Sequence, residues 1–140
     1  MKKIHYVGCF FDRTALFACP EARKHPRLDR SILHPHVTFA YRPSLVPRAL
    51  FGLPVTVRVT GYGCDGENEA FSVAFEEVPE NLRPLTERIA LPHITLSVSR
   101  DGKPVNSKTL SFAPVPSFLL CGTFGGMDEA GTLHLSPEEM

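Results

Sequence analysis

Two short segments of this chain alternate between apolar and polar residues, and this alternation constrains the fold more than any other feature. The segments are LHPHVTFAYR at residues 33–42 and LPHITLSVS at residues 91–99. Successive side chains of a β-strand point to opposite faces, so such a pattern is typical of a half-buried strand. In the first segment the alternation places Leu33, Val37 and Tyr41 on the apolar face.

Runs of aromatic and β-branched residues predict further strands, and Gly or Pro clusters predict turns between them. The further strands are expected at residues 4–11, 55–62, 71–78, 118–124 and 132–136. Gly125, Gly126 and Gly131 are expected to form the turn region between the last two. Leu82, Leu85 and Ile89 lie at helical spacing, which predicts a helix of about three turns that ends before Pro92. Residues 12–33 are expected to form a loop with at most a short helix around residues 21–24.

The length and composition indicate one globular unit. With 140 residues, 43% of them hydrophobic, residues 1–140 are expected to form a single domain with its own core. The apolar runs are far shorter than the roughly 18 residues that a membrane helix needs, so we expect no membrane association and a cytoplasmic location. The formal net charge of zero argues against avid non-specific nucleic-acid binding. The four cysteines form no C-x-x-C pair, so neither a zinc knuckle nor a disulfide framework is indicated, and buried or half-buried thiols are expected.

The two alternating segments share a His-x-Thr pair on their polar face. These pairs are His36 with Thr38 and His93 with Thr95. In a strand each pair places an imidazole beside a hydroxyl while the residue between them points into the core. If the two strands lie side by side, two imidazoles can flank one phosphorus atom and two hydroxyls can donate hydrogen bonds to its oxygens.

The motifs HVTF at residues 36–39 and HITL at residues 93–96, with their separation and the order of expected elements, resemble the two-histidine (2H) phosphoesterase superfamily. That superfamily includes the 2′-5′ RNA ligase-like proteins and cyclic phosphodiesterases. The resemblance implies an α+β fold of two pseudo-symmetric lobes of antiparallel sheet, with few helices on the outside and a central cleft that carries the His-x-Thr strands. The chain departs from the larger members of that superfamily in two features: residues 12–33 offer only a weak helix, and no long basic insert is present.

The resemblance also implies a chemistry and a partner. It implies metal-independent phosphoesterase activity on 2′,3′-cyclic or 2′-5′ phosphodiesters of a nucleotide or an RNA end, without a cofactor. One of His36 and His93 would act as general base and the other as general acid, in either assignment. Thr38 and Thr95 would bind the phosphoryl oxygens. We expect a monomer that needs no obligate protein partner.

Two alternatives remain at this level. The first is a metal site formed by His34, His36 and His93, since His34 lies two residues before His36. No acidic or cysteine ligand accompanies these histidines. The other is a non-catalytic module that binds a nucleotide or an RNA end in the same cleft. Tyr6 and Tyr41 could stack on a base, but strand aromatics usually belong to a core, and they are left out of the expected site.

Overall fold

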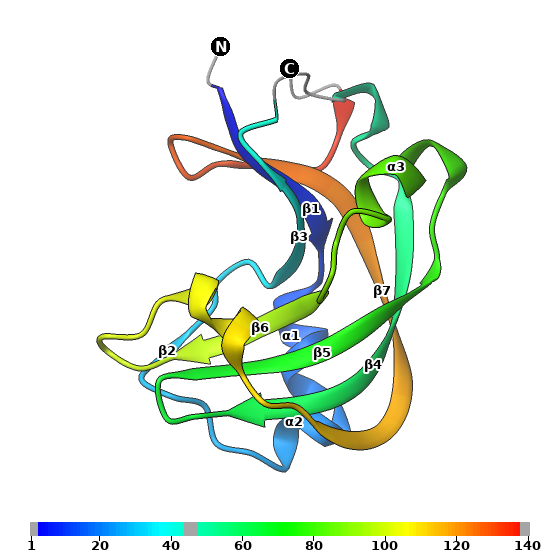
Figure 1. The fold of residues 1–140 in the computed structure, drawn as a ribbon. Helices are drawn as coiled ribbons and strands as arrows, with labels where there is room; N and C mark the ends of the chain where they lie inside the picture. Colours follow the sequence, from blue (N-terminus) through cyan, green and yellow to red (C-terminus); the bar gives the residue numbers. More distant parts are fainter. Residues whose placement is uncertain (1–2, 44–47, 138–140) are drawn as a thin grey trace.

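The computed structural model describes residues 3–43 and 48–137, and its dominant feature is one sheet of eight strands (Figure 1). In chain order the strands are β1 (Ile4–Phe10), β2 (Arg30–Ser31), β3 (His36–Tyr41), β4 (Pro54–Cys64), β5 (Asn68–Glu77), β6 (His93–Val98), β7 (Ala113–Asp128) and β8 (Leu133–His134). Across the sheet they follow the order β2-β6-β5-β4-β7-β1-β3, and β8 pairs with β7. Each of these pairings is antiparallel.

The helices in the described part of the chain are few and short. They are α1 (Arg13–Ala18), α2 (Pro20–Arg23), α3 (Arg83–Thr86) and the 3₁₀ helices η1 (Arg48–Leu50), η2 (Glu80–Leu82) and η3 (Pro104–Thr109). This mostly antiparallel sheet with few helices agrees with the expected α+β class. The strands form one continuous sheet, so a division into two symmetric lobes stays a prediction. None of the described helices has the length and apolar character needed to cross a membrane.

Strong curvature brings the two ends of the sheet together. Strand β3 lies at one end of the strand order and β6 next to the other end, yet these two strands contact each other. Both pairings of β4 shift register between Val59 and Gly61, and such irregularities bend a strand and increase its twist. The 16-residue β7 follows the bend: its first part pairs with β4 and its last part with β1 (Figure 1). The curved sheet thereby places the two His-x-Thr strands opposite each other.

The core is formed by alternate residues of the strands and follows the expected alternation where strands are long. Val55, Val57 and Val59 of β4 are fully buried, and the residues between them are more exposed. Phe71 of β5 and Phe124 of β7 are also fully buried. Burial of apolar area at about 25 cal/mol per Å² is the main stabilisation that such a core supplies.

The apolar face expected for residues 33–42 is only half correct. Val37 and Phe39 are buried, but Leu33 is 68% and Tyr41 58% exposed. The reason is that β3 covers only His36–Tyr41, so Leu33 precedes the strand and Tyr41 ends it at the edge of the sheet. In β6 the apolar residues Ile94, Leu96 and Val98 are all buried, as the alternation predicts, but Thr95 and Ser97 on the other face are buried as well, so this strand is not half-buried.

The expected helical segments differ from the observed ones, and the strands expected at 118–124 and 132–136 span Ala113–Asp128 and Leu133–His134. The three-turn helix is shorter, because the chain forms the 3₁₀ helix η2 and then α3, which ends at Thr86. Pro84 occupies the first turn of α3, where its missing N–H is tolerated, and this position separates the two helices. Leu82 still lies in the core, with Leu85 and Ile89 packed against it. In residues 12–33 the structure forms α2 where a short helix was expected and adds α1, which Asp12 caps by accepting a hydrogen bond from the Ala15 N–H at 2.9 Å.

The turn expected at Gly125 and Gly126 is wrong. Strand β7 continues through both glycines to Asp128, and the turn to β8 follows it. A Cβ atom at Gly125 would lie 2.5 Å from the carbonyl oxygen of His134, and one at Gly126 would lie 2.8 Å from the Phe51 ring. These glycines therefore permit close packing within the sheet instead of a change of direction.

The prediction that the cysteine thiols are buried or half-buried is also incomplete, since Cys64 and Cys121 are exposed.

Candidate active site

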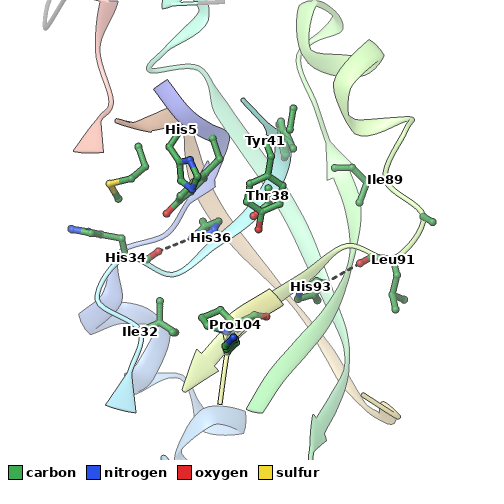
Figure 2. Close-up of a pocket in the computed structure, with 17 residues that line it drawn as sticks. His5, Ile32, His34, His36, Thr38, Tyr41, Ile89, Leu91, His93 and Pro104 are labelled. Carbon is green, nitrogen blue, oxygen red and sulfur yellow. Dashed lines mark hydrogen bonds between the residues drawn. The ribbon is translucent and has the colours of Figure 1, made fainter. Parts of the chain in front are cut away.

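One cavity of about 710 Å³ lies between β3 and β6, and it contains all four residues expected from the sequence (Figure 2). His36 and Thr38 reach it from β3, and His93 and Thr95 reach it from β6. The remaining lining residues are His5, Tyr6, Ile32, His34, Phe39, Ala40, Tyr41, Ile89, Ala90, Leu91, Lys103, Pro104 and Met127. These described lining residues include one lysine and no Asp or Glu.

The rings of His36 and His93 are oriented by the same type of hydrogen bond to a nearby backbone carbonyl oxygen. The Nδ1 atom of His36 lies 2.8 Å from the carbonyl oxygen of His34, and the Nδ1 atom of His93 lies 3.0 Å from that of Leu91. A carbonyl oxygen only accepts, so Nδ1 carries the hydrogen in both rings and Nε2 is the nitrogen left for a ligand. In both segments a proline stands between the residue whose carbonyl oxygen accepts the bond and the histidine, and it restricts the backbone of the residue before it.

His36 lies in a more apolar environment than His93. Its ring stacks on Tyr6, with ring centroids 4.8 Å apart, and the Phe10 ring centroid lies at 5.1 Å. This burial lowers the pKa of His36 to about 4, and the nearby His93 and His34 add smaller lowering contributions. His36 is therefore neutral at pH 7, and its Nε2 atom offers a lone pair to a proton.

The two threonines are not equivalent in the unliganded site. Thr38 is half-buried, and its hydroxyl has no hydrogen-bond partner among the described residues. Thr95 is only 8% exposed, and its hydroxyl donates to Ser107 Oγ at 2.9 Å, with the Pro104 carbonyl oxygen at 3.4 Å. Ser107 Oγ also accepts a hydrogen bond from Asn68 Nδ2 at 3.2 Å. Thr38 is thus the hydroxyl that is ready to bind a ligand, and Thr95 belongs to a buried network.

The three-histidine alternative does not form. Residue 34 precedes β3, so its side chain does not share a strand face with that of His36. Figure 2 shows the His34 side chain directed away from His93. Within residues 3–43 and 48–137 no group of three or more His, Cys, Asp or Glu is arranged to hold a metal ion. His34 instead contributes its carbonyl oxygen to His36 and lines a second, smaller cavity of about 380 Å³.

Sequence reasoning missed several residues of this cavity. Tyr6 is a ring partner of His36, and Tyr41 stands exposed at the rim, although both were assigned to a core. Lys103 lines the cavity and Ser107 accepts the Thr95 hydrogen bond behind it; both lie beyond the second motif, on the segment that leads into and forms η3. No local pattern marks these two residues, because their place depends on how that segment folds back over β6.

The arrangement combines two imidazoles with available Nε2 atoms and one hydroxyl without a partner around a space lined by no carboxylate among the described residues. Such a set can bind a phosphate group and move protons on two sides of it. No family model matches this sequence, and no curated protein matches it. The chain is thus an α+β protein in which one cavity is lined by His36 and Thr38 from β3 and by His93 and Thr95 from β6.

Proposed function

We propose that this protein is a metal-independent phosphoesterase that acts on 2′,3′-cyclic or 2′-5′ phosphodiesters of nucleotides or RNA ends. The observation that carries the proposal is the matched anchoring of His36 and His93. Each Nδ1 donates to a carbonyl two residues earlier, which leaves both Nε2 atoms available in one cavity. A pair of oriented imidazoles can supply both the general base and the general acid for a reaction at phosphorus.

The different environments assign the two roles. The pKa of His36 is about 4, so this residue is the general base that takes a proton from the attacking water. We assign His93 as the general acid, because it is the other motif imidazole with an available Nε2 atom in the cavity and its Nδ1 bond lies at the solvent side. The water oxygen forms a bond to phosphorus while the bond to the leaving ribose oxygen breaks and His93 protonates that oxygen. Exchange of one proton with solvent then restores both rings.

The two hydroxyls have separate parts in this proposal. The Thr38 hydroxyl donates to a non-bridging phosphoryl oxygen, where negative charge develops in the transition state. Thr95 is the corresponding residue of the second motif, and its bond to Ser107 must rearrange before it can donate to the substrate. The β1–β3 and β5–β6 pairs on the two sides of the cavity would form the two lobes. We further propose that the protein acts as a cytoplasmic monomer without a cofactor.

A binding module is the second candidate, and the Thr95 geometry favours it. In the unliganded site the Thr95 hydroxyl is engaged with Ser107, so only one of the two motif hydroxyls is available for a phosphoryl oxygen. A module of this kind would hold a nucleotide phosphate with Thr38 and the imidazoles and would release it unchanged.

Hydrolysis of nucleoside 2′,3′-cyclic phosphates and of a 2′-5′-linked dinucleotide, with and without EDTA, tests the proposal. We expect EDTA-resistant turnover, with kcat lower by about 10²- to 10⁴-fold in His36→Gln and in His93→Gln. His25→Gln is the matched control, because His25 lies outside the cavity, and it should keep full activity. Circular dichroism checks that each variant is folded. Full activity in either cavity variant contradicts the mechanism, and tight nucleotide binding without turnover supports the binding module.

A further inference from the structure

Lys103 carries the only permanently charged side chain among the described residues that line the cavity. Its side chain is exposed, and its ammonium group makes no ion pair or hydrogen bond with the described residues. No described lining residue is a carboxylate, so nothing within the cavity neutralises this charge. An unpaired cation at the wall of a cavity that already suits one phosphate provides a place for a further negative charge.

The backbone of Lys103 is fixed by a buried amide and does not belong to a loose surface loop. Asn68 is 1% exposed, and its Nδ2 atom donates to the Lys103 carbonyl oxygen at 2.6 Å. The Asn106 N–H donates to the same oxygen at 2.9 Å. The lysine side chain therefore starts from a defined point beside the cavity.

The same amide links Lys103 to the second motif. Asn68 Nδ2 also donates to Ser107 Oγ at 3.2 Å, and Ser107 accepts the hydrogen bond from Thr95 at 2.9 Å. One buried side chain thus positions both the lysine and the network of the motif threonine. The backbone from which the lysine side chain extends is thereby fixed relative to the second motif.

We propose that Lys103 binds a second phosphate of the substrate, next to the phosphodiester that reacts, and thereby selects substrates that carry one. This inference rests on the proposed function for the position of the first phosphate. Two sources supply the same chemistry. One is a 5′-phosphate on a mononucleotide, and the other is the last internucleotide phosphate of an RNA end. An ammonium group makes a charge-assisted hydrogen bond to either of them.

Three substrates separate these sources. They are adenosine 2′,3′-cyclic phosphate, the same nucleotide with a 5′-phosphate, and an adenosine dinucleotide that ends in a 2′,3′-cyclic phosphate. We expect kcat/KM to be about tenfold higher for at least one substrate with the extra phosphate, as one charge-assisted hydrogen bond would give. Lys103→Ala should remove this preference and leave hydrolysis of the simple nucleotide unchanged, and Lys103→Arg should retain it. Lys24→Ala, at an exposed lysine outside the cavity, is the matched control and should keep the preference.

A binding measurement keeps this inference independent of turnover. Adenosine 3′,5′-bisphosphate should bind the wild-type protein about tenfold more tightly than adenosine 3′-monophosphate, and Lys103→Ala should bind the two equally. Tighter bisphosphate binding without hydrolysis of any substrate would overturn the catalytic proposal and support the role of Lys103. Equal affinities in the wild-type protein, or a preference that survives Lys103→Ala, would overturn the role of Lys103 whether or not the protein hydrolyses a phosphodiester.

Discussion

The imidazole of His36 stacks on the phenol ring of Tyr6, with ring centroids 4.8 Å apart and an angle of 24° between the ring planes. Tyr6 belongs to β1 and His36 to the neighbouring β3, so the contact is made across the sheet. It withdraws one face of the imidazole from water, and burial is the largest cause of the low pKa of His36. An aromatic neighbour from another strand therefore contributes to the burial that lowers the pKa of His36.

Removal of the Tyr6 ring should raise the pKa of His36. In Tyr6→Ala water reaches the imidazole, and we expect the pKa of His36 to move from about 4 toward the ordinary 6.5. An NMR titration of the histidine ring protons measures this shift. Tyr6→Phe keeps the stacked ring and serves as the control. A pKa of His36 that stays near 4 in Tyr6→Ala would show that other neighbours cause the depression.

The pH profile of turnover should identify the base. If His36 is the base, it must be neutral, so the acidic limb of kcat/KM should lie near pH 4, the pKa of this residue in the free protein. If His36 were the acid, it would have to be protonated, and kcat/KM would already fall above pH 4. Rates at constant ionic strength from pH 3.5 to pH 8 distinguish the two assignments. High activity at pH 7 with a limb near pH 4 supports His36 as base.

Acid should destabilise the folded protein through the same residue. The folded-state pKa of His36 is depressed, so the unfolded chain takes up a proton as the pH falls through about 6.5 and the folded chain takes it up only near pH 4. The associated stability is complete above pH 6.5 and decreases by about 3 kcal/mol as the pH falls to 4. Urea unfolding at both pH values should show that His36→Gln loses about 3 kcal/mol less than the wild type. Equal losses in the two proteins would contradict the depressed pKa.

Loss of the two motif hydroxyls should have different effects. Thr38→Val removes a hydroxyl without a described protein partner, so stability should change by less than about 0.5 kcal/mol while turnover falls by about 10- to 100-fold. Thr95→Val removes a buried hydrogen bond to Ser107 and should decrease stability by about 1–2 kcal/mol. Thermal unfolding and steady-state kinetics on both variants test the contrast. A Thr38→Val variant as unstable as Thr95→Val would refute the assignment of Thr38 as the free hydroxyl.

A buried ionic network should hold the segment before β3 against the sheet. Glu69 of β5 is fully buried, and it accepts hydrogen bonds from Tyr62 at 2.6 Å and Ser97 at 2.7 Å and pairs with Arg27 at 3.0 Å. Glu69→Leu leaves these donors without an acceptor, so we expect a loss of about 3–5 kcal/mol in the free energy of urea unfolding.

The exposed pair of Arg58 and Glu76 supplies the control for that experiment. Their nitrogen and oxygen atoms lie 2.9 Å apart, but both side chains are in contact with solvent. Glu76→Gln should therefore leave the unfolding free energy almost unchanged. Similar losses of unfolding free energy in Glu69→Leu and Glu76→Gln would show that the buried Glu69 network stabilises the fold no more than an exposed ion pair does.

The strands that carry the candidate site could be predicted closely, and the helices less well. Residues 93–98 form β6 with Ile94 in the core, as the alternation indicates, because strand periodicity is a property of neighbouring residues. Helix α1 was missed although Asp12 stands at its N-cap, since six residues give too short a hydrophobic period to detect. The Gly125–Gly126 pair was misread because a glycine in a turn and a glycine in a crowded strand look alike in a sequence.

The sequence by itself determined which residues share a strand face and how each motif histidine is anchored. The strand alternation and the bond from Nδ1 to the carbonyl two residues earlier both form within a few neighbouring residues, around Pro35 in one motif and Pro92 in the other. Only the tertiary structure decided that His36 stacks on Tyr6 and that Lys103 stands at the same cavity. These contacts join segments that are distant along the chain, and they exist because the curvature of one sheet brings β3 and β6 together.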